Sequence, residues 1–284
     1  MYLILGRSCI YCVLLISIGT EICLTSQTHG QPTDEGVIPR QKRDINDANG
    51  SSYFYFQQPE YPRDCQEVYD ECQNTLDGVY LIKPDGYSEP FEVFCNNTID
   101  SGGWTVFQRR MDGGVDFYRD WVDYKTGFGF LHREFWLGNE KIAFITNQKD
   151  YEMRLDMVDS SGSTSYAYYN LFRISDEGTK YSLVEVGSYN GTIGLLEGHD
   201  YLATHRGHPF STRDRDNDNR DTGEPNCAVH HHGAWWYTNC YSSNLNGDYQ
   251  SSADTGLCLY DSTNSNQCNF RFTEMKIRPT QTNR

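Results

Sequence analysis

The middle of the chain contains segments in which apolar and polar residues alternate. In residues 151–157 every second residue is apolar, which predicts a strand with one buried face. Residues 91–94 and 104–107 are shorter segments rich in aromatic and β-branched residues, and they predict two further strands. Strands of this kind need a partner layer that covers their apolar face.

The other patterns add helix and irregular structure to these strands. Residues 139–147 place Ile142 and Ile145 three positions apart, which predicts a short helix with Asn139 as its cap. Residues 205–265 show almost no periodicity and are rich in Gly, Asn, Asp and Ser. A long irregular segment inside a compact domain is usually functional, and we expect disulfides and an ion to hold it. The fold class is therefore α+β with a loop-rich C-terminal part.

The N-terminus carries an apolar run at residues 9–19 behind a short basic start. About 20 apolar residues are needed to span a bilayer, so this run is too short for a membrane anchor. Its pattern is typical of a secretory signal peptide, which we place at residues 1–26 with its end between Thr20 and Ser26. The alternative is a buried N-terminal strand. We expect a secreted, extracellular protein without membrane insertion.

Residues 27–60 separate this leader from the globular part. They are polar and lack apolar periodicity, which predicts a propeptide or linker ahead of a domain at residues 61–280. Residues 40–43 read Arg-Gln-Lys-Arg, a pattern that secretory-pathway convertases cut, so we expect cleavage after Arg43. The alternative is an uncut basic site in a flexible linker.

Glycosylation signals and net charge agree with export. Asn49, Asn96 and Asn190 each begin an Asn-x-Ser/Thr motif. The chain of 284 residues has 24 Lys and Arg against 39 Asp and Glu, a formal charge of −15. Such an acidic chain repels phosphate backbones and anionic membranes, so nucleic acid is excluded as a partner.

Ten cysteines are present, of which Cys9 and Cys12 fall in the predicted leader, as Cys23 would under a late cleavage. The other seven are Cys65, Cys72, Cys95, Cys227, Cys240, Cys258 and Cys268. In an oxidising compartment they should form disulfides. Their spacing favours the pairs Cys65–Cys95, Cys227–Cys240 and Cys258–Cys268, but about 105 arrangements are open. The leftover Cys72 is then free, pairs with Cys23 or links two chains.

Asp214, Asp216 and Asp218 place three carboxylates at alternate positions of one loop. We expect them to converge, and they would repel one another unless a cation lay between them. Oxygen ligands in an irregular loop favour Ca²⁺ over Mg²⁺. The loop is not an EF-hand, because Asn219 and Pro225 stand where Gly and Glu are required, so carbonyls or water must complete the site. The alternative is a solvated acidic turn.

A series of motifs then follows in order over residues 61–279. They lie at residues 63–65, 102–110, 116–121, 127–129, 134–139, 210–212, 214–218, 226–228, 233–237, 243–247 and 274–279. This series resembles the fibrinogen C-terminal domain shared by fibrinogen chains, ficolins, tachylectins, tenascins and angiopoietins. The resemblance implies a small N-terminal subdomain with the disulfide Cys65–Cys95, a central twisted antiparallel sheet with short helices, and a loop-rich calcium-binding C-terminal subdomain.

The resemblance also implies a set of calcium ligands. Asp216 and Asp218 match the side-chain ligands of the family, and the carbonyls of Arg220 and Thr222 match its backbone ligands. Asp214 is then a neighbouring carboxylate. The segment between Asp218 and the following cysteine is a few residues longer than usual in the family.

Family members that act as lectins hold acetyl groups in a pocket beside the loop that corresponds to Cys227–Cys240. The peptide before the second cysteine, here Asn239–Cys240, is cis in such pockets. This sequence departs from the lectin pattern, since His231 replaces an aromatic residue, Tyr241 replaces a His, and Ser-Ala at 252–253 replaces Tyr-Ala. We expect the pocket to be formed by His231, Trp236, Asn239, Cys240, Tyr241 and Ala253.

Two kinds of chemistry are not favoured. Residues 230–232 are three consecutive His, but neighbouring imidazoles cannot all face one ion, so we do not expect zinc there. The motifs Gly-x-Ser-x-Gly and His-Glu-x-x-His are missing from the sequence, and we predict that the protein is not an enzyme.

The sequence therefore predicts a calcium-dependent recognition protein, lectin-like, that binds acetylated or other glycans in innate defence. The alternative is a matrix or signalling ligand that binds a cell-surface or matrix protein through the same C-terminal face. A disulfide-linked homo-oligomer through Cys72 or Cys23 is a further expectation, because the sequence encodes no stalk that could supply avidity.

Overall fold

The computed structural model describes residues 10–13, 22–25, 44–46, 52–54, 61–72, 76–193, 200–221, 223–260 and 266–280. The chain forms two compact units, Met1–Tyr61 and Pro62–Arg284. The first contains two antiparallel pairs of short strands, which are β1 (Ile10–Val13) with β2 (Ile22–Thr25) and β3 (Asp44–Asn46) with β4 (Ser52–Phe54). The predicted cleavage site at Arg43 and the glycosylation signal at Asn49 lie outside the described residues. None of the described helices has the length and apolar character that a membrane crossing requires.

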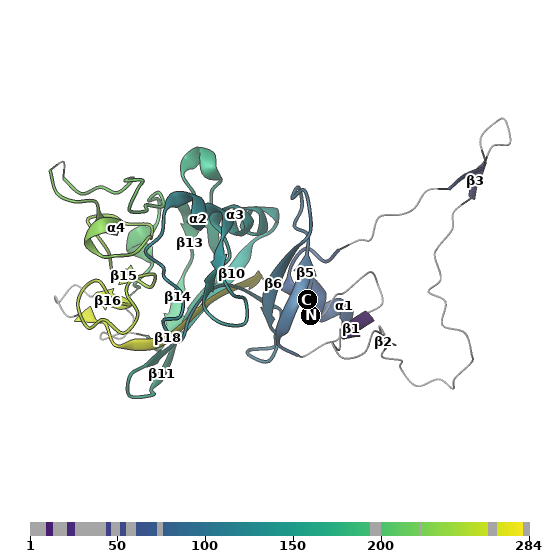
Figure 1. Ribbon diagram of the computed structural model, residues 1–284, viewed down its shortest axis with the longest axis horizontal. Coiled ribbons are helices and arrows are strands. Elements are labelled where there is room, and N and C mark those ends of the chain that lie inside the picture. Colours follow the sequence, from purple (N-terminus) through teal and green to yellow (C-terminus); the bar gives the residue numbers. More distant parts are fainter. Residues whose placement is uncertain are drawn as a thin grey trace. The chain divides into compact units, whose positions relative to one another are not determined.

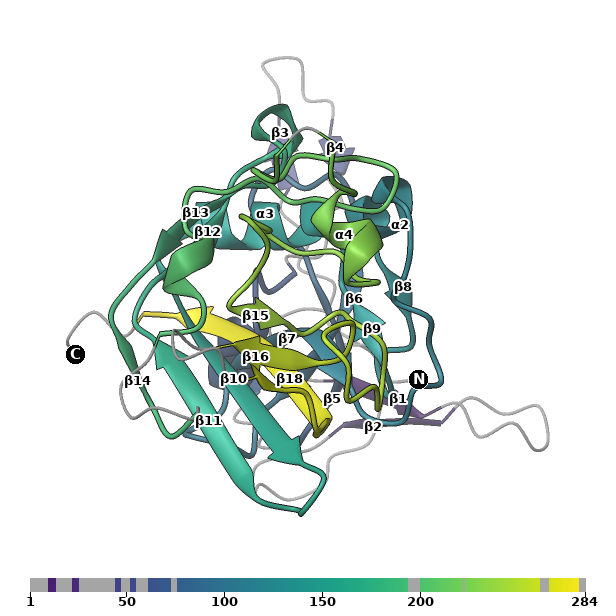
Figure 2. The same ribbon diagram turned by 90° about the vertical axis from the view of Figure 1, so that its left-hand side faces the viewer.

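The second unit (Figure 1) is built on an antiparallel sheet with the strand order β14-β11-β10-β18-β7-β6-β5, to which β9 and β8 add beside β7 (Figure 2). Its strands are β5 (Gly78–Ile82), β6 (Phe91–Asn96), β7 (Trp104–Arg110), β8 (Phe128–Gly129), β9 (Phe135–Trp136), β10 (Tyr151–Asp159), β11 (Thr164–Tyr169), β14 (Tyr189–Gly191) and β18 (Phe270–Pro279). The strands predicted at 91–94, 104–107 and 151–157 are confirmed as β6, β7 and β10. The last strand, β18, lies between β10 and β7, so the sheet joins both ends of the unit (Figure 2).

Short helices lie between these strands. They are α1 (Cys65–Cys72), α2 (Trp121–Thr126), α3 (Asn139–Gln148) and α4 (Cys227–His230), with 3-10 turns η1 (Glu177–Thr179) and η2 (Ala203–His205). The predicted helix at 139–147 is confirmed as α3, with Ile142 and Ile145 buried on its inner face. The predicted cap was wrong. Gly138 holds the N-cap position, and the Asn139 side chain accepts a hydrogen bond from the buried Trp136 indole at 3.0 Å instead.

Residues 200–221 and 223–260, which we call the C-terminal loop region, contain little regular structure, as expected. The remaining short strands of the unit are β12 (Phe172–Ile174), β13 (Leu183–Val186), β15 (Ser243–Asn244), β16 (Cys258–Tyr260) and β17 (Asn266–Gln267). The disulfides Cys227–Cys240 and Cys258–Cys268 stabilise this region, and Cys65–Cys95 ties α1 to β6. All three pairings agree with those that the spacing favoured.

Aromatic side chains join the sheet to the C-terminal loop region. Phe107 of β7 stacks on Phe172 with a centroid distance of 5.5 Å and meets Trp136 edge to face at 5.9 Å. Phe210 and Trp236 of the loop region continue the cluster at 5.3 Å from each other. Such ring pairs bury large apolar areas and add directional contacts, so the irregular region shares the core of the sheet.

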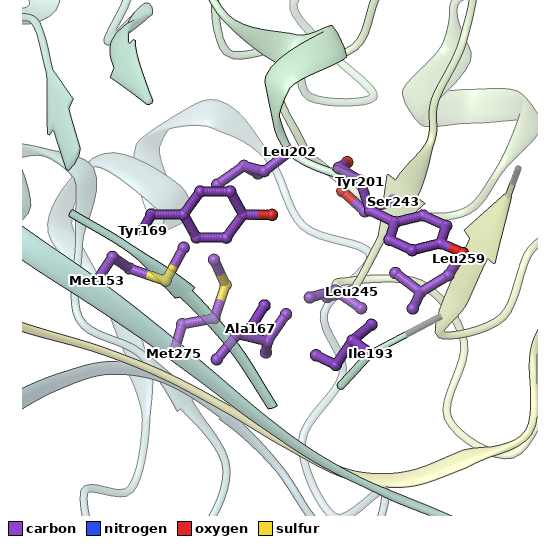
Figure 3. A pocket seen from close by; sticks show the side chains of 11 residues that line it. Met153, Ala167, Tyr169, Ile193, Tyr201, Leu202, Ser243, Leu245, Leu259 and Met275 are labelled. Atoms are coloured by element: carbon purple, nitrogen blue, oxygen red, sulfur yellow. Dashed lines mark hydrogen bonds between the residues drawn. The ribbon is translucent and has the colours of Figure 1, made fainter. Parts of the chain in front are cut away.

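A second apolar contact between the two layers is nearly free of voids. Met153, Tyr169 and Met275 of the sheet face Leu245 and Leu259 of the loop region around a cavity of about 10 Å³ (Figure 3). One water needs roughly 10–15 Å³ and polar partners, and this lining is mostly apolar. The apolar side chains of the loop region and of the sheet therefore pack tightly against each other.

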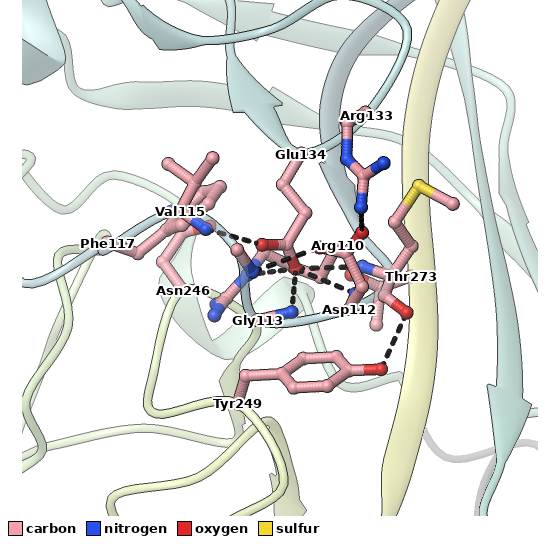
Figure 4. A network of polar contacts seen from close by, with 12 residues as sticks. Arg110, Asp112, Gly113, Val115, Phe117, Arg133, Glu134, Asn246, Tyr249 and Thr273 are labelled. Carbon is pink, nitrogen blue, oxygen red and sulfur yellow. Dashed lines mark hydrogen bonds and ion pairs between the residues drawn. The ribbon is translucent and has the colours of Figure 1, made fainter.

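The buried carboxylate of Glu134 lies in a polar network that also joins the sheet to the C-terminal loop region (Figure 4). Glu134 has no exposed surface, and its two oxygens accept hydrogen bonds at 2.9–3.2 Å from the backbone N–H groups of Met111, Asp112, Gly113 and Val115. The Arg110 guanidinium lies 3.7 Å from Glu134 and donates to the carbonyls of Leu245 and Gly247 at 3.3 and 2.7 Å. The segment that follows β15 is thereby anchored to β7.

A row of buried charges crosses three strands on one face of the sheet. Lys276 on β18 is 1 % exposed, and its ammonium lies 2.7 Å from both Asp156 on β10 and Glu274 on β18. Arg109 on β7 pairs with Glu274 at 2.6 Å. Burial raises the pKa of Glu274, but the cations of Lys276 and Arg109 outweigh it, and the net pKa is lowered. Each buried charge in this row has an opposite charge beside it.

Candidate functional site: the acidic loop and the Cys227–Cys240 loop

The three carboxylates of the acidic loop do not converge. Asp214 accepts hydrogen bonds from the Thr212 hydroxyl at 2.6 Å and from the N–H of Trp121 at 2.9 Å. Trp121 is the first residue of α2, whose N-terminal N–H groups need acceptors. The predicted convergence of Asp214 with Asp216 and Asp218 was wrong, because Asp214 serves this helix end. No ligand group in the described ranges contains all three.

Asp216 and Asp218 remain together in one turn. The N–H of Asp218 donates to Asp216 at 3.2 Å, and Asp218 itself accepts from the N–H of Arg220 at 2.8 Å and from that of Cys227 at 2.6 Å. Neither carboxylate forms an ion pair within the described part of the chain. Two uncompensated carboxylates in an irregular turn are a donor set that fits Ca²⁺. Thr222, the other expected ligand, lies outside the described residues.

The disulfide loop begins directly after this turn. Asn226 caps α4 by accepting a hydrogen bond from the N–H of Val229 at 2.7 Å. Cys227, the first residue of α4, is joined to Cys240, and the peptide Asn239–Cys240 is cis, as the family resemblance implies. Asn239 itself is exposed. The loop thus projects from a capped helix and returns to it through a covalent bond.

His231 and Tyr241 form an aromatic pair beside the disulfide. Their rings meet edge to face with centroids 4.7 Å apart, and both reach the backbone carbonyl of Asp254, Nδ1 of His231 at 3.1 Å and the Tyr241 hydroxyl at 2.7 Å. Burial and the neighbouring His230 lower the pKa of His231 to about 4, so its imidazole is neutral at pH 7. Ala253, next to Asp254, is exposed. These contacts bring the predicted residues His231, Tyr241 and Ala253 into one surface.

Trp236 is not part of this surface, and its prediction as a pocket residue was wrong. It has no exposed area, its indole N–H donates to the carbonyl of Tyr181 at 2.8 Å, and its ring packs on Phe210. A buried indole needs an acceptor for its N–H, and Tyr181 supplies one inside the core. The candidate surface therefore has one aromatic wall fewer than predicted.

His205 is a functional support that the sequence did not reveal. Its Nε2 accepts hydrogen bonds from the N–H groups of Ser242 and Ser243 at 3.2 and 3.1 Å, so its Nδ1 carries the proton and donates to the carbonyl of Trp236 at 2.7 Å. Burial lowers the pKa of His205 to about 4. A single His in a segment without periodicity gives no sequence signal for this role. Here it fixes the chain on both sides of Cys240.

The remaining predicted positions lie away from this surface. Asn190 is exposed on the edge strand β14, where a glycan has room. Asn96 is half-buried, and its side-chain nitrogen, the atom that would carry a glycan, donates to Glu274 at 3.1 Å. Cys72 ends α1, but the side chains of Cys72 and Cys23 lie outside what the structure describes, so their pairing stays a prediction.

Relatives of the chain carry the same domain. The chain is 40 % identical over 282 residues to "Fibrinogen-like protein A" of Apostichopus parvimensis, covering 94 % of this chain and 95 % of that protein. It is 43 % identical over 249 residues to "Fibrinogen C domain-containing protein 1-A" of Xenopus laevis, covering 84 % of this chain but only 50 % of the relative.

Solved structures match the fold. The fibrinogen-like globe domain of human ANGPTL2 aligns with a TM-score of 0.69 at 38 % identity, covering 77 % of this chain and 99 % of that domain. Lamprey fibrin D-dimer in complex with the peptide Gly-His-Arg-Pro-amide aligns with a TM-score of 0.67 at 35 % identity, covering 78 % of this chain and 75 % of the other. The family model described as "Fibrinogen beta and gamma chains, C-terminal globular domain" matches residues 61–280. The chain therefore belongs to the fibrinogen C-terminal domain family.

Proposed function

We propose that the protein is secreted and recognises a ligand with the surface beside the Cys227–Cys240 disulfide, and that calcium bound by Asp216 and Asp218 sets the shape of this surface. The proposal assigns binding and not catalysis to the chain, in keeping with its family of globular binding domains. Within the proposal, the carbonyls of Arg220 and Thr222 complete the calcium site.

The observation that carries the proposal is the direct bond between the two loops. The carboxylate of Asp218 accepts a hydrogen bond from the N–H of Cys227 at 2.6 Å, and the N–H of Asn219 donates to the carbonyl of Thr238 at 3.1 Å. The acidic turn therefore touches the disulfide loop near both of its ends. A cation that pulls Asp218 into place would also fix Cys227, so calcium and ligand binding should depend on each other.

We propose glycans with acetyl groups as the first ligand class. The His231 and Tyr241 rings offer an apolar corner for a methyl group, and the exposed Asn239 offers amide donors and acceptors beside it. His231 is neutral at pH 7, so the corner carries no full charge that would disfavour a neutral acetamide. Such a surface fits an innate-defence lectin.

A receptor or matrix protein is the second candidate. Two observations favour it. Trp236 is buried and does not supply the wall that a tight acetyl pocket would use. In addition, the structurally similar lamprey fibrin D-dimer is complexed with a peptide. In this alternative the same surface receives a segment of a partner protein.

A glycan array probed in calcium and in EDTA separates the candidates. The lectin hypothesis predicts retention on N-acetylated sugars that EDTA removes, and loss of that retention in Asp218→Asn. The matched control is Asp214→Asn, since Asp214 serves α2 and should leave calcium dependence intact. Saturable binding to a cell-surface protein with no signal on the array would favour the second candidate. Binding that EDTA leaves unchanged would contradict the role of calcium in either.

We also propose a covalent dimer through Cys72 or Cys23. A non-reducing gel of the secreted protein should show a band of twice the chain mass that disappears on reduction and in Cys72→Ser or Cys23→Ser. A monomer on the non-reducing gel would contradict this proposal and leave the ligand hypothesis untouched.

A further inference from the structure

Two of the three consecutive imidazoles meet a carboxylate from a distant part of the chain. One possible ligand atom each from His230, His231 and Asp254 lies within 4.8 Å of the others. His231 is 8 % exposed and held by its neighbours, whereas His230 and Asp254 are exposed. Nδ1 of His231 lies 3.8 Å from the Asp254 carboxylate and 3.1 Å from the Asp254 carbonyl, so a metal bound at Nδ1 would replace the hydrogen bond to that carbonyl. Asp254 could not be predicted as a ligand, because it follows the His run by more than twenty positions.

The third imidazole turns to the opposite side. His232 has a φ of +48°, a left-handed conformation that reverses the direction of the chain after α4. Its ring stacks on Tyr118 at 5.1 Å, and its Nδ1 lies 3.1 Å from the Asp248 carboxylate. Three neighbouring imidazoles cannot all face one ion. The fold directs the His232 ring away, so only His230 and His231 remain beside Asp254.

We propose that His230, His231 and Asp254 bind a divalent transition-metal ion of the zinc class. Two imidazole nitrogens and one carboxylate oxygen are an ordinary zinc ligand set, with water in the fourth position. Ligand atoms around tetrahedral zinc lie about 3.3–3.6 Å apart, since each is roughly 2.0–2.2 Å from the metal. The spread here is up to 4.8 Å, so the exposed side chains of His230 and Asp254 must rotate toward His231 for a metal to bind.

This site differs from the acidic turn in its chemistry. Asp216 and Asp218 offer oxygen alone, which suits a hard cation, whereas imidazole nitrogen selects zinc, copper or nickel over calcium. The proposed metal does not depend on calcium or on the proposed ligand. Metal binding would nevertheless restrict the proposed ligand surface, because His231 also packs against Tyr241 there. Zinc bound there would hold the ring of His231 and the segment of Asp254 together.

Calorimetric titration of zinc chloride into the full secreted protein tests this inference. The protein is prepared without a polyhistidine tag and kept in excess calcium, so that the acidic turn is saturated. The expected result is one zinc per chain, with affinity reduced at least tenfold in both His230→Gln and Asp254→Asn. Both side chains are exposed, so neither change should prevent folding.

The matched control is His232→Gln, which removes an imidazole from the same run but from the other side of the turn. It should change zinc affinity by less than twofold, as should Asp218→Asn. Cobalt provides a second readout, because a tetrahedral site with nitrogen ligands gives visible absorption bands that His230→Gln should abolish. Absence of zinc binding, or an equal loss of affinity in His232→Gln, would overturn the inference. A failure of the glycan or calcium experiments would not affect it.

Discussion

The sheet and the C-terminal loop region both bury polar side chains, but they satisfy them in different ways. On the sheet, Lys276 lies between Asp156 and Glu274, so charged groups compensate one another across strands whose backbones are already paired. In the loop region, neutral side chains replace missing backbone partners. The side chain of Asn244, for example, donates to the carbonyls of His231 and Gly256 at 3.2 and 3.1 Å.

The two regions are therefore vulnerable to different changes. Backbone ladders leave the sheet with few unsatisfied groups, and its weak point is an uncompensated buried charge. The loop region has few ladders, so individual side chains such as His205 carry the bonds that a ladder would supply, and its weak point is a change in their protonation or identity. Both regions share one core, yet they should respond to different perturbations.

The largest expected loss of stability comes from a substitution on the sheet. Lys276→Met removes the cation that Asp156 and Glu274 share and leaves each carboxylate with one arginine, Arg154 or Arg109. Removing one partner of a buried pair costs up to about 3–5 kcal/mol of unfolding free energy, and the two arginines should keep the loss toward the lower end of that range. Urea denaturation of the variant and the parent measures this cost. Arg271→Met on the same strand is the control, because Arg271 is exposed, and it should change stability by less than about 0.5 kcal/mol. A loss below about 1 kcal/mol in Lys276→Met would mean that the charge row is not what stabilises this face.

The next largest effect is a pH-dependent loss of stability in the loop region. The pKa of His205 is lowered to about 4 from an unperturbed 6.5, so the unfolded chain binds a proton before the folded one does. Stability is therefore full above pH 6.5 and falls as the pH decreases toward 4. The linkage relation gives a loss of about 2.5 kcal/mol between pH 7 and 4.5.

Urea titrations at these two pH values check the effect. His205→Gln should be less stable than the parent at pH 7 but should show a flatter pH dependence, with a residual slope from His231, whose pKa is lowered as well. An unchanged slope in His205→Gln would show that other groups cause the pH dependence. Lys276→Met should keep the full slope, which separates the two regions.

The smallest effect concerns the cap of α4. Asn226→Ala removes the hydrogen bond to the N–H of Val229 and should cost about 1 kcal/mol, the usual value for an N-cap. The loss should be accompanied by faster hydrogen exchange at Val229. Ser252→Ala, at an exposed residue of the same loop region, is a control expected to change neither quantity. Equal stability of the Asn226 variant and the control would indicate that the disulfide alone holds α4.

The sequence predicted the sheet better than the candidate site, for physical reasons. Alternation at 151–157 reflects burial of every second residue. β10 follows that pattern except at Glu152, which is also buried and pairs with Arg278 at 2.6 Å. The disulfide pairs followed from the spacing of the cysteines, and the cis peptide followed from a resemblance to a family. The sequence did not predict the roles of His205 and Asp254 or the burial of Trp236, because these depend on single long-range contacts that leave no periodic pattern. The same holds for Asp214, whose partner Trp121 is 93 positions away.

The central claim is that the acidic turn and the disulfide loop act as one unit through the bond between Asp218 and Cys227. Hydrogen exchange of residues 226–241, measured by mass spectrometry in calcium and in EDTA, tests it most directly. We predict slower exchange of this segment in calcium, with no such difference in Asp218→Asn and no change in β10 or β18. Equal exchange rates of the segment in calcium and in EDTA would contradict the account.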